Sequence, residues 1–411
     1  MRVLLTTRGS AGHVLPLAPF GHACLRAGHE VLVAAQPQHR ANVERAGLAF
    51  CATADPPAEQ WLPLMAQFGA LGIEQANARM IGEFFARIDT RAALAPLRAV
   101  VEKWRPDVIV RESWEFASTL VAELYEVALV RVGLGLAAME ELAVRLAAPA
   151  VDEHRAALGL PPDPDGARLR DTPYLTAVPE PLDDPGAVTP RLTYRFAPYT
   201  AAAAPPPLGD WWPGNDDPLV LVSFGSVAAA GHLPYFPGLY LATIDALAPL
   251  PARILVTTGD SGDRAQLGAL PTNVRVERWV AQDAVAPHAA AIVCHGGYGS
   301  TLGALRHGVP LVVLPLFSTD QWANAAAVAR AGAGIALDAE HATRRVLALP
   351  SDETVAALRP ALARVLGDEA FARGARRLAA ATRALPPVDA AVDVLARTYA
   401  TYTGVPTGAR A

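Results

Sequence analysis

A histidine in a glycine-rich loop is the first group in the sequence that could do chemistry. The loop, Gly9-Ser10-Ala11-Gly12-His13, stands between an apolar run (2–7) and a helical stretch from about residue 14 to residue 27. Glycines let the chain turn tightly from strand to helix, which places His13 at the amino end of that helix. The helix dipole disfavours an imidazolium there, so we expect a neutral ring that can accept a proton.

Two further features bear on that role. The alternative is a dinucleotide-binding turn with an incidental histidine, but the loop lacks the full G-x-G-x-x-G spacing, and the next strand ends at Ala35-Gln36 with no acid for a ribose hydroxyl. A histidine base works best with a carboxylate on its other nitrogen. Glu112, just after the strand-like segment 105–110, is the candidate. A solvated loop acid or a partner of Arg111 is the plainer interpretation of Glu112, and both stay open.

A second glycine-rich turn, HGGYGS (295–300), follows an apolar run. Backbone N–H groups at such a turn, with the dipole of a helix that we expect to begin near Ser300, can hold a phosphate group. His295 can donate a hydrogen bond to the same anion. Ser226, in the SFGSV turn after an earlier strand, could approach it as well. The alternatives are a plain tight turn for the glycines and an ordinary turn serine for Ser226.

The elements that would position these turns alternate between strand-like and helix-like segments. The segments with the length and apolar content of strands are 2–7, 29–35, 105–110, 127–133, 218–224, 253–258, 274–279, 290–296, 309–315 and 333–338. Most are separated by helix-length segments, which is typical of parallel βαβ units with helices on both faces of the sheet. Ligands of open parallel sheets bind beyond the carboxyl ends of the strands, so the turns that follow strands carry the most weight.

The length of 411 residues suits two domains of about 200 residues each. The composition changes at TAAAAPPPLGDWWPGNDD (200–217), which is rich in proline and glycine and typical of a linker. We therefore predict an α/β fold with an N-terminal domain over 1–205, a linker over 206–217 and a C-terminal domain over 218–411. The segment from about residue 351 onward has a helical pattern throughout.

Composition argues against several classes of function. The chain has 35 basic and 40 acidic side chains, without the basic surplus of a nucleic-acid-binding protein. Its three cysteines are too few for a disulfide framework or a zinc cluster. No apolar run approaches the roughly 18 residues of a membrane helix, and the apolar segment after Arg2 is too short for a signal peptide. We expect a cytoplasmic protein with no nucleic-acid partner and no integral membrane segment.

Taken together and in order, these turns resemble the nucleotide-sugar-binding signature of glycosyltransferase family 1 enzymes with the GT-B fold. In particular, the sequence is similar to bacterial glycosyltransferases of antibiotic and polyketide biosynthesis. The resemblance covers nearly the whole chain: the G-x-x-G-H-x-x-P loop, the SFGSV turn, the W-x-x-Q pair, the HGGYGS turn and the closing DQ pair. It implies two Rossmann-like domains facing across an interdomain cleft, with a helical C-terminal tail whose last helix is a candidate to pack back on the N-terminal domain.

The resemblance also implies roles for individual residues. Those expected to bind the nucleotide-sugar are Gly12, Ser226, Trp279, Val280, Gln282, His295, Gly297, Gly299, Ser300, Asp320 and Gln321. Trp279 would stack on the nucleobase, the 295–300 turn would hold the pyrophosphate, and Asp320 with Gln321 would hydrogen-bond the sugar. His13, with Glu112 as partner, would deprotonate the acceptor hydroxyl. As alternatives, Trp279 could be ordinary core and Asp320 a first-turn acid of a helix that starts near Ser318.

Two departures from the family pattern matter. Family members commonly place an aspartate beside the histidine, and the nearest match here is the longer Glu112. In many enzymes that use UDP-glucose, a glutamate eight residues after the histidine that corresponds to His295 hydrogen-bonds both ribose hydroxyls. This chain has Gly303 at that position. A site without that carboxylate gains nothing from a 2′-hydroxyl. We therefore expect a dTDP-sugar donor, in particular a dTDP-deoxysugar.

The resemblance implies direct displacement with inversion at the anomeric carbon and no metal or other cofactor. Asp163 and Asp165, in a Pro/Gly-rich stretch, are interpreted as turn formers. Trp114, Phe116 and Phe84 are the candidates to bind an apolar small-molecule aglycone, although Phe84 also fits a core-facing helical stripe. A homodimer stays open. The alternatives to a transferase are a nucleotide-sugar 2-epimerase of the same fold and a non-catalytic nucleotide-sugar-binding relative.

Overall fold

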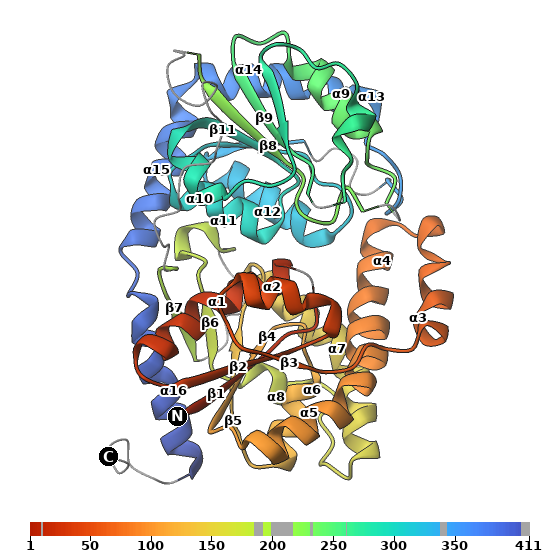
Figure 1. Cartoon of the computed structure of the whole chain (residues 1–411), viewed down its shortest axis with the longest axis vertical. Coiled ribbons are helices and arrows are strands. Elements are labelled where there is room, and N and C mark those ends of the chain that lie inside the picture. Colours follow the sequence, from red (N-terminus) through yellow and green to blue (C-terminus); the bar gives the residue numbers. More distant parts are fainter. Residues whose placement is uncertain are drawn as a thin grey trace.

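The computed structural model describes residues 1–9, 11–184, 192–198, 217–230, 233–259, 261–337 and 343–403. It contains two parallel sheets, each flanked by helices; the N-terminal half is at the bottom of Figure 1 and the C-terminal half at the top. This is the two-sheet α/β arrangement that the alternating segments predict. The predicted linker lies outside the described residues apart from Asp217, so the domain boundaries stay a prediction.

The N-terminal sheet has seven strands in the order β3-β2-β1-β4-β5-β6-β7, and every neighbouring pair is parallel. The strands are β1 (Arg2–Thr6), β2 (Glu30–Ala35), β3 (Phe50–Ala52), β4 (Val108–Glu112), β5 (Ala128–Val132), β6 (Tyr174–Thr176) and β7 (Thr193–Arg195). The adjacent strands β1 and β4, in the middle of the sheet, are buried on both faces, as their apolar sequences require.

The C-terminal sheet has six strands in the order β10-β9-β8-β11-β12-β13, again all parallel. They are β8 (Leu219–Ser223), β9 (Arg253–Thr257), β10 (Val274–Glu277), β11 (Ala289–Cys294), β12 (Leu311–Val313) and β13 (Gly334–Ala336). Each lies within a segment that the sequence predicts as a strand, except that β11 begins one residue before its predicted segment 290–296. The central strands β8 and β11 are adjacent, which brings the turns that follow them to the same edge of the sheet.

Helices cover both sheets. In the N-terminal half they are α1 (Ala11–Arg26), α2 (Arg40–Arg45), α3 (Ala58–Met65), α4 (Ile73–Arg79), the π-helical η3 (Met80–Asp89), α5 (Thr90–Trp104), α6 (Ala117–Leu124), α7 (Ala137–Ala157) and α8 (Ala167–Arg170). In the C-terminal half they are α9 (Gly238–Leu247), α10 (Gln282–Val285), α11 (Tyr298–Arg306), α12 (Thr319–Arg330), α13 (Asp352–Ala356), α14 (Leu358–Gly367) and α15 (Glu369–Arg383). Over the ranges that the structure describes, none of the helices combines the length and the apolar character needed to span a membrane.

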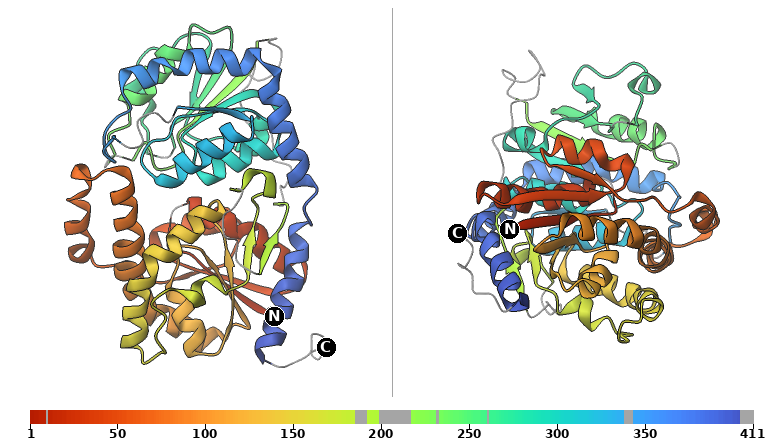
Figure 2. Two further views of the ribbon diagram at one scale, coloured as in Figure 1. Left: turned by 180° about the vertical axis from the view of Figure 1, so that it is seen from behind. Right: turned by 60° about the horizontal axis from the view of Figure 1, so that its bottom comes forward.

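The end of the chain returns to the N-terminal half. Helix α15 runs down the side of the molecule, and α16 (Ala391–Thr403) lies against the N-terminal sheet (Figure 2). Val394 and Leu395 are buried in the same apolar cluster as β1, and Arg26 of α1 pairs with Asp389 at 2.8 Å. Helix α16 is therefore part of the hydrophobic core of the N-terminal half.

A second connection between the halves comes from α3 and α4, which stand at the side of the N-terminal half (Figure 1). Leu64 of α3, Ile73 of α4 and Phe68 in the turn between them share a buried cluster with Trp322 and Val346 of the C-terminal half. The Ser318 hydroxyl donates to the Asn77 side-chain oxygen at 3.2 Å. Phe68 therefore contributes to contact between the halves.

Candidate active site

His13 lies in the turn between β1 and α1. Helix α1 begins at Ala11, three residues earlier than the sequence pattern predicts, so His13 belongs to its first turn. A Cβ atom added at Gly9 would lie 2.3 Å from the Cγ and Cδ2 atoms of the His13 ring. The ring therefore packs directly on the Gly9 backbone, which is the close approach that glycine permits.

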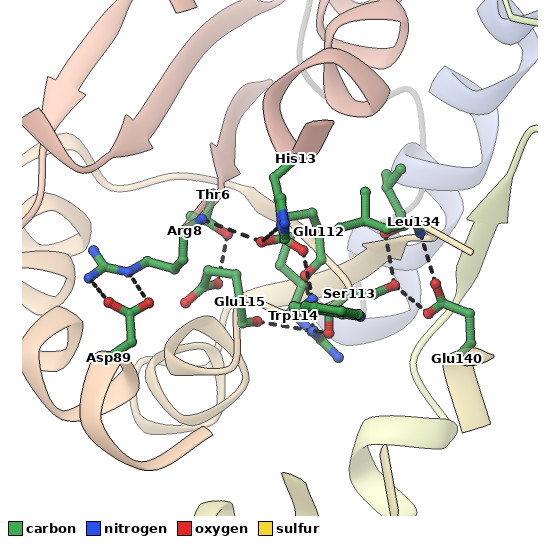
Figure 3. Close-up of polar contacts among 12 residues, drawn as sticks. Thr6, Arg8, His13, Asp89, Glu112, Ser113, Trp114, Glu115, Leu134 and Glu140 are labelled. Atoms are coloured by element: carbon green, nitrogen blue, oxygen red, sulfur yellow. Dashed lines mark hydrogen bonds and ion pairs between the residues drawn. The ribbon is translucent and has the colours of Figure 1, made fainter. Parts of the chain in front are cut away.

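Glu112 ends β4 and lies beside that ring. Because β1 and β4 are adjacent parallel strands, the residues that follow them meet at one edge of the sheet. His13 Nδ1 is 3.1 Å from Glu112 Oε1 (Figure 3). The Trp114 backbone N–H donates to Glu112 Oε2 at 2.6 Å. The pair that the sequence predicts is thus formed, and it leaves His13 Nε2 as the nitrogen available to another molecule.

Neither plainer interpretation of Glu112 describes its surroundings. The Glu112 side chain is fully buried, so it is not a solvated loop acid. The Arg111 guanidinium does not contact the Glu112 carboxylate; it donates to the backbone carbonyls of Glu112, Ser113 and Glu115 at 3.1, 2.9 and 3.0 Å. Arg111 therefore holds the backbone at the end of β4, while the carboxylate faces His13.

The electrostatics of His13 differ from the helix-dipole expectation. Burial lowers the pKa of His13, but the carboxylates of Glu112, Asp320 and Asp89 together outweigh burial and raise that pKa above 6.5. The expected suppression of the imidazolium is therefore wrong in direction, because a full negative charge at 3.1 Å outweighs the partial charges of a helix end. A raised pKa makes the ring a stronger base once it is neutral.

Aromatic side chains surround the ring. Phe85 of η3 stacks on His13 with ring centroids 5.8 Å apart and planes inclined at 29°, and Trp114 approaches edge-on at 5.7 Å. Phe84 packs on Phe85 at 5.2 Å. Trp114 and Phe84, two of the residues predicted to bind the aglycone, are thus close to His13, and both are only partly buried. Phe85 was not among the predicted site residues.

Phe116 corrects a prediction. Its side chain is 1% exposed and packs in an apolar cluster with Leu120 and Val144. The Arg111 guanidinium lies 5.7 Å from its ring centroid. Phe116 is core, because the chain turns into α6 at Ala117 and directs this side chain inward.

Three further buried carboxylates lie near the pair and were not predicted (Figure 3). Asp89 pairs with Arg8, Glu115 accepts from the Thr6 hydroxyl at 2.9 Å, and Glu140 accepts from the Leu134 N–H at 2.8 Å. Burial raises the pKa of all three. Each also has a partner distant in sequence, namely Arg8 for Asp89, Thr6 for Glu115 and Ser113 for Glu140, so no local pattern distinguishes them from surface acids.

The turn after β11 has a different character. His295 is buried between two glycines: a Cβ atom at Gly225 or at Gly297 would lie 2.7 or 2.5 Å from its ring. Gly225 belongs to the SFGSV turn, so the segment that carries Ser226 adjoins the HGGYGS turn, as the sequence predicts. Burial lowers the pKa of His295 to about 4, and the ring is therefore neutral at physiological pH.

The amino end of α11 is open. This helix begins at Tyr298, two residues before the predicted start at Ser300. Gly299 is exposed, and a Cβ atom there would meet nothing within 4 Å. The first N–H groups of a helix have no partner within the helix, so this end can receive an anion.

Of the predicted nucleoside residues, Val280 and Gln282 lie next to that helix. Trp279 is 65% exposed, which is incompatible with a place in the core. Val280 is partly buried against the C-terminal core. The Gln282 side-chain amide donates to the Ser300 carbonyl at 2.9 Å, and a Cβ atom at Gly303 would lie 2.8 Å from that same amide nitrogen. Gln282 therefore fills the space beside position 303.

Asp320 and Gln321 lie in the first turn of α12. Gln321 is buried, and its side-chain oxygen accepts from the backbone N–H groups of Leu316 and Phe317 at 2.7 and 3.1 Å. Asp320 accepts from the Ser318 hydroxyl. Burial raises the pKa of Asp320, against the opposing effects of the Ser318 hydrogen bond and the His13 charge.

The two halves meet at the carboxyl ends of their strands. Asp320 follows β12 and is close enough to His13, which follows β1, to contribute to its raised pKa. Tyr298, at the start of α11, is close enough to the Thr176 side chain and the Ala177 backbone, at the end of β6, for both to counter the rise in its pKa that burial causes. The structure thus brings the predicted base and the predicted anion cradle to facing edges of the two sheets. In the described ranges, no three His, Cys, Asp or Glu side chains come together in a way that could hold a metal ion.

Comparison with known proteins gives matches along the whole chain. Residues 22–217 match the family model for the N-terminal domain of erythromycin biosynthesis protein CIII-like proteins, and residues 241–396 match the model for the C-terminal domain. The L-demethylnoviosyl transferase of Streptomyces niveus is 33% identical over 82% of this chain and 85% of that protein. The elloramycin glycosyltransferase ElmGT of Streptomyces olivaceus is 31% identical over 99% of both.

A solved structure has the same fold. The spinosyn rhamnosyltransferase SpnG, complexed with thymidine diphosphate, superposes with a TM-score of 0.76 at 25% sequence identity, covering 96% of this chain and 100% of that one.

Proposed function

This chain belongs to the family of bacterial natural-product glycosyltransferases, and from that premise we propose that it moves a deoxysugar from a dTDP-sugar to a hydroxyl group of an apolar aglycone. Sugar transfer is the activity of the family. The donor, the base and the stereochemical course are the parts proposed here. The observation that carries the proposal is the 3.1 Å contact between His13 Nδ1 and the buried Glu112 carboxylate.

His13 would act as the general base. Its Nε2 would take the proton of the acceptor hydroxyl while the oxygen attacks the anomeric carbon and the bond from that carbon to the diphosphate breaks. Attack from the face opposite the diphosphate inverts the anomeric configuration. Glu112 would stabilise the imidazolium that forms, as carboxylates do in histidine-based catalytic sites. Such proton transfer typically contributes about 10²–10⁴-fold to the rate.

The C-terminal turn would bind the leaving diphosphate. The open amino end of α11 offers backbone N–H groups and the positive end of a helix dipole, and His295 offers a neutral N–H donor. Donors held in place before the reaction stabilise charge that develops in the transition state. We propose that these groups suffice without a metal. EDTA should then leave the rate unchanged within about twofold, since full metal activation is worth several kcal/mol; loss of activity that Mg²⁺ restores would refute this point.

The choice of dTDP rests on position 303. With glycine there and Gln282 packed beside it, position 303 presents no carboxylate to a ribose 2′-hydroxyl. SpnG, which has the same fold, has been observed with thymidine diphosphate, which supports the same nucleotide here. The test compares the rates with matched dTDP- and UDP-sugars. A clear preference for the UDP-sugar would contradict the donor assignment and leave the rest of the proposal intact.

A designed variant sharpens that test. Gly303→Glu alone would bring its side chain against the Gln282 amide, 2.8 Å from the new Cβ atom. Gly303→Glu combined with Gln282→Ala removes this clash. We expect the double variant to shift the preference toward the UDP-sugar, with Gln282→Ala alone as the matched control.

The activity itself is tested by incubating the protein with a panel of dTDP-sugars and aglycones and measuring the masses of the products by mass spectrometry. A product heavier than the aglycone by one sugar residue supports a transferase. Release of an epimerised sugar nucleotide without transfer would contradict the proposal and favour the epimerase alternative.

A further inference from the structure

Arg8 and Asp89 form a buried ion pair next to the His13 turn (Figure 3). Their side chains are 3% and 1% exposed. Arg8 Nε donates to Asp89 Oδ2 at 2.7 Å, and Arg8 Nη2 donates to the other carboxylate oxygen. The guanidinium also donates to the Thr53 hydroxyl at 2.7 Å and to the Ala54 carbonyl at 2.8 Å. One side chain thus connects the turns after β1 and β3 with the end of η3.

The backbone of Arg8 contacts the predicted catalytic pair. Its N–H donates to Glu112 Oε1 at 3.3 Å, which is the same oxygen that lies 3.1 Å from His13 Nδ1. Arg8 therefore touches Glu112 through its main chain and Asp89 through its side chain. A shift of this residue would move both contacts together.

Asp89 is the last residue of η3, which is π-helical over the ten residues Met80–Asp89. Extended π-helices are rare, and π-helical turns are frequent at functional sites. This helix carries Phe85, whose ring stacks on His13 with centroids 5.8 Å apart. The ion pair therefore anchors the end of the helix whose aromatic side chain packs on the base.

Net stability does not account for such a pair. Two buried charges gain little over well-packed apolar side chains, because their desolvation offsets their attraction. A bidentate contact between guanidinium and carboxylate does impose a defined geometry that apolar packing lacks. The pair is therefore best understood by what it positions.

We propose that Arg8 and Asp89 are positioning residues for the general base. The pair fixes both Glu112 and helix η3, which carries Phe85, to the loop that contains Arg8. The His13 ring is thereby held between the Glu112 carboxylate and the Phe85 ring, with Nε2 directed at the acceptor. This inference rests on the proposed role of His13.

The test replaces the ion pair with apolar side chains of similar size, Arg8→Met together with Asp89→Leu. Such a replacement commonly preserves the folded state, which circular dichroism and the Tm report. We expect kcat to fall about 100-fold, the loss that a displacement of about 1 Å typically causes, while the donor KM stays within about twofold because the proposed donor contacts other than Gly12 belong to the other half. Arg8→Lys keeps the charge but not the bidentate geometry, and should lose less.

The chain offers a matched control. Arg155 of α7 is also 1% exposed and pairs with Glu123 of α6 through two hydrogen bonds of 2.7 and 3.0 Å. Both residues lie near the carboxyl ends of helices that return to the opposite edge of the sheet from His13. Arg155→Met together with Glu123→Leu should leave kcat unchanged.

The outcomes separate the possibilities. A folded Arg8→Met/Asp89→Leu variant with wild-type kcat would overturn the proposal, and so would an equal loss of kcat in the control variant. If the double variant does not fold, the kinetics of the Arg8→Lys variant test the proposal instead. A wild-type kcat in Arg8→Lys would overturn it. A reduced kcat with an unchanged donor KM would support it. A His13→Ala variant with wild-type kcat would instead refute the proposed function, on which the inference rests.

Discussion

His13 and His295 lie at similar turns in the two halves, after the central strands β1 and β11, but have opposite electrostatic environments. Each follows a parallel strand of a central sheet, and each lies at a glycine-rich turn that leads into a helix. His13 has a buried carboxylate 3.1 Å from its ring, and its pKa is raised. His295 is buried between the backbones of Gly225 and Gly297, and its pKa is lowered to about 4.

The difference shows how one residue type can serve two steps of a reaction. A carboxylate partner makes proton uptake favourable, which suits a base that must become an imidazolium. Burial without such a partner keeps the ring neutral, which suits a hydrogen-bond donor to a diphosphate. Substitutions of these residues test whether His13 acts as the base and His295 as the hydrogen-bond donor to the diphosphate.

The largest effect should come from His13→Ala. Removing the base should lower kcat by about 10²–10⁴-fold, the usual contribution of general base catalysis. The donor KM should change little, because the donor would bind mainly to the other half. Steady-state kinetics with saturating donor measure both quantities, and a wild-type kcat would contradict the role of His13.

His295→Ala should follow with a loss in kcat of about 10²–10³-fold, comparable to the removal of one oxyanion-hole donor. The donor KM should rise as well, since the same contact would bind the ground-state diphosphate. A variant that changed the acceptor KM but not the donor KM would contradict the assignment of His295 to the diphosphate.

A smaller effect is expected from Gly9→Ala. The added Cβ atom would lie 2.3 Å from the His13 ring, so the ring must move. A displacement of about 1 Å typically costs about 10²-fold in rate. Gly238→Ala is the matched control, because a Cβ atom at Gly238 would meet nothing within 4 Å. Equal kcat values in the two variants would mean that the position of the ring does not limit the reaction.

Much of this comparison could be predicted from sequence. The strand-turn-helix pattern is local, so it places His13 and the 295–300 turn at strand ends. The carboxyl ends of adjacent parallel strands share one edge, so Glu112 could be matched to His13 although 99 positions separate them. The helix starts were off by two or three residues, because helices begin where backbone geometry permits rather than at the first polar residue.

The remaining features depend on contacts that no spacing encodes. Arg8 and Asp89 are 81 positions apart, and their turns carry no pattern that pairs them. Phe116 is an aromatic residue close in sequence to Glu112, which suggests a pocket residue. Its side chain is buried because it directly precedes α6 and points into the core. The direction of the His13 pKa shift depends on a distance to Glu112 that only the tertiary structure supplies.

The most direct test of the central claim is the pH dependence of kcat/KM for the acceptor in the wild type and in Glu112→Gln. The base must be neutral to act, so wild-type kcat/KM should fall as the pH drops through a pKa above 6.5. Without the Glu112 charge, burial should dominate, and the acid limb should move to lower pH while kcat declines. An acid limb at the same pH in both proteins would contradict the His13–Glu112 pair as the source of the base.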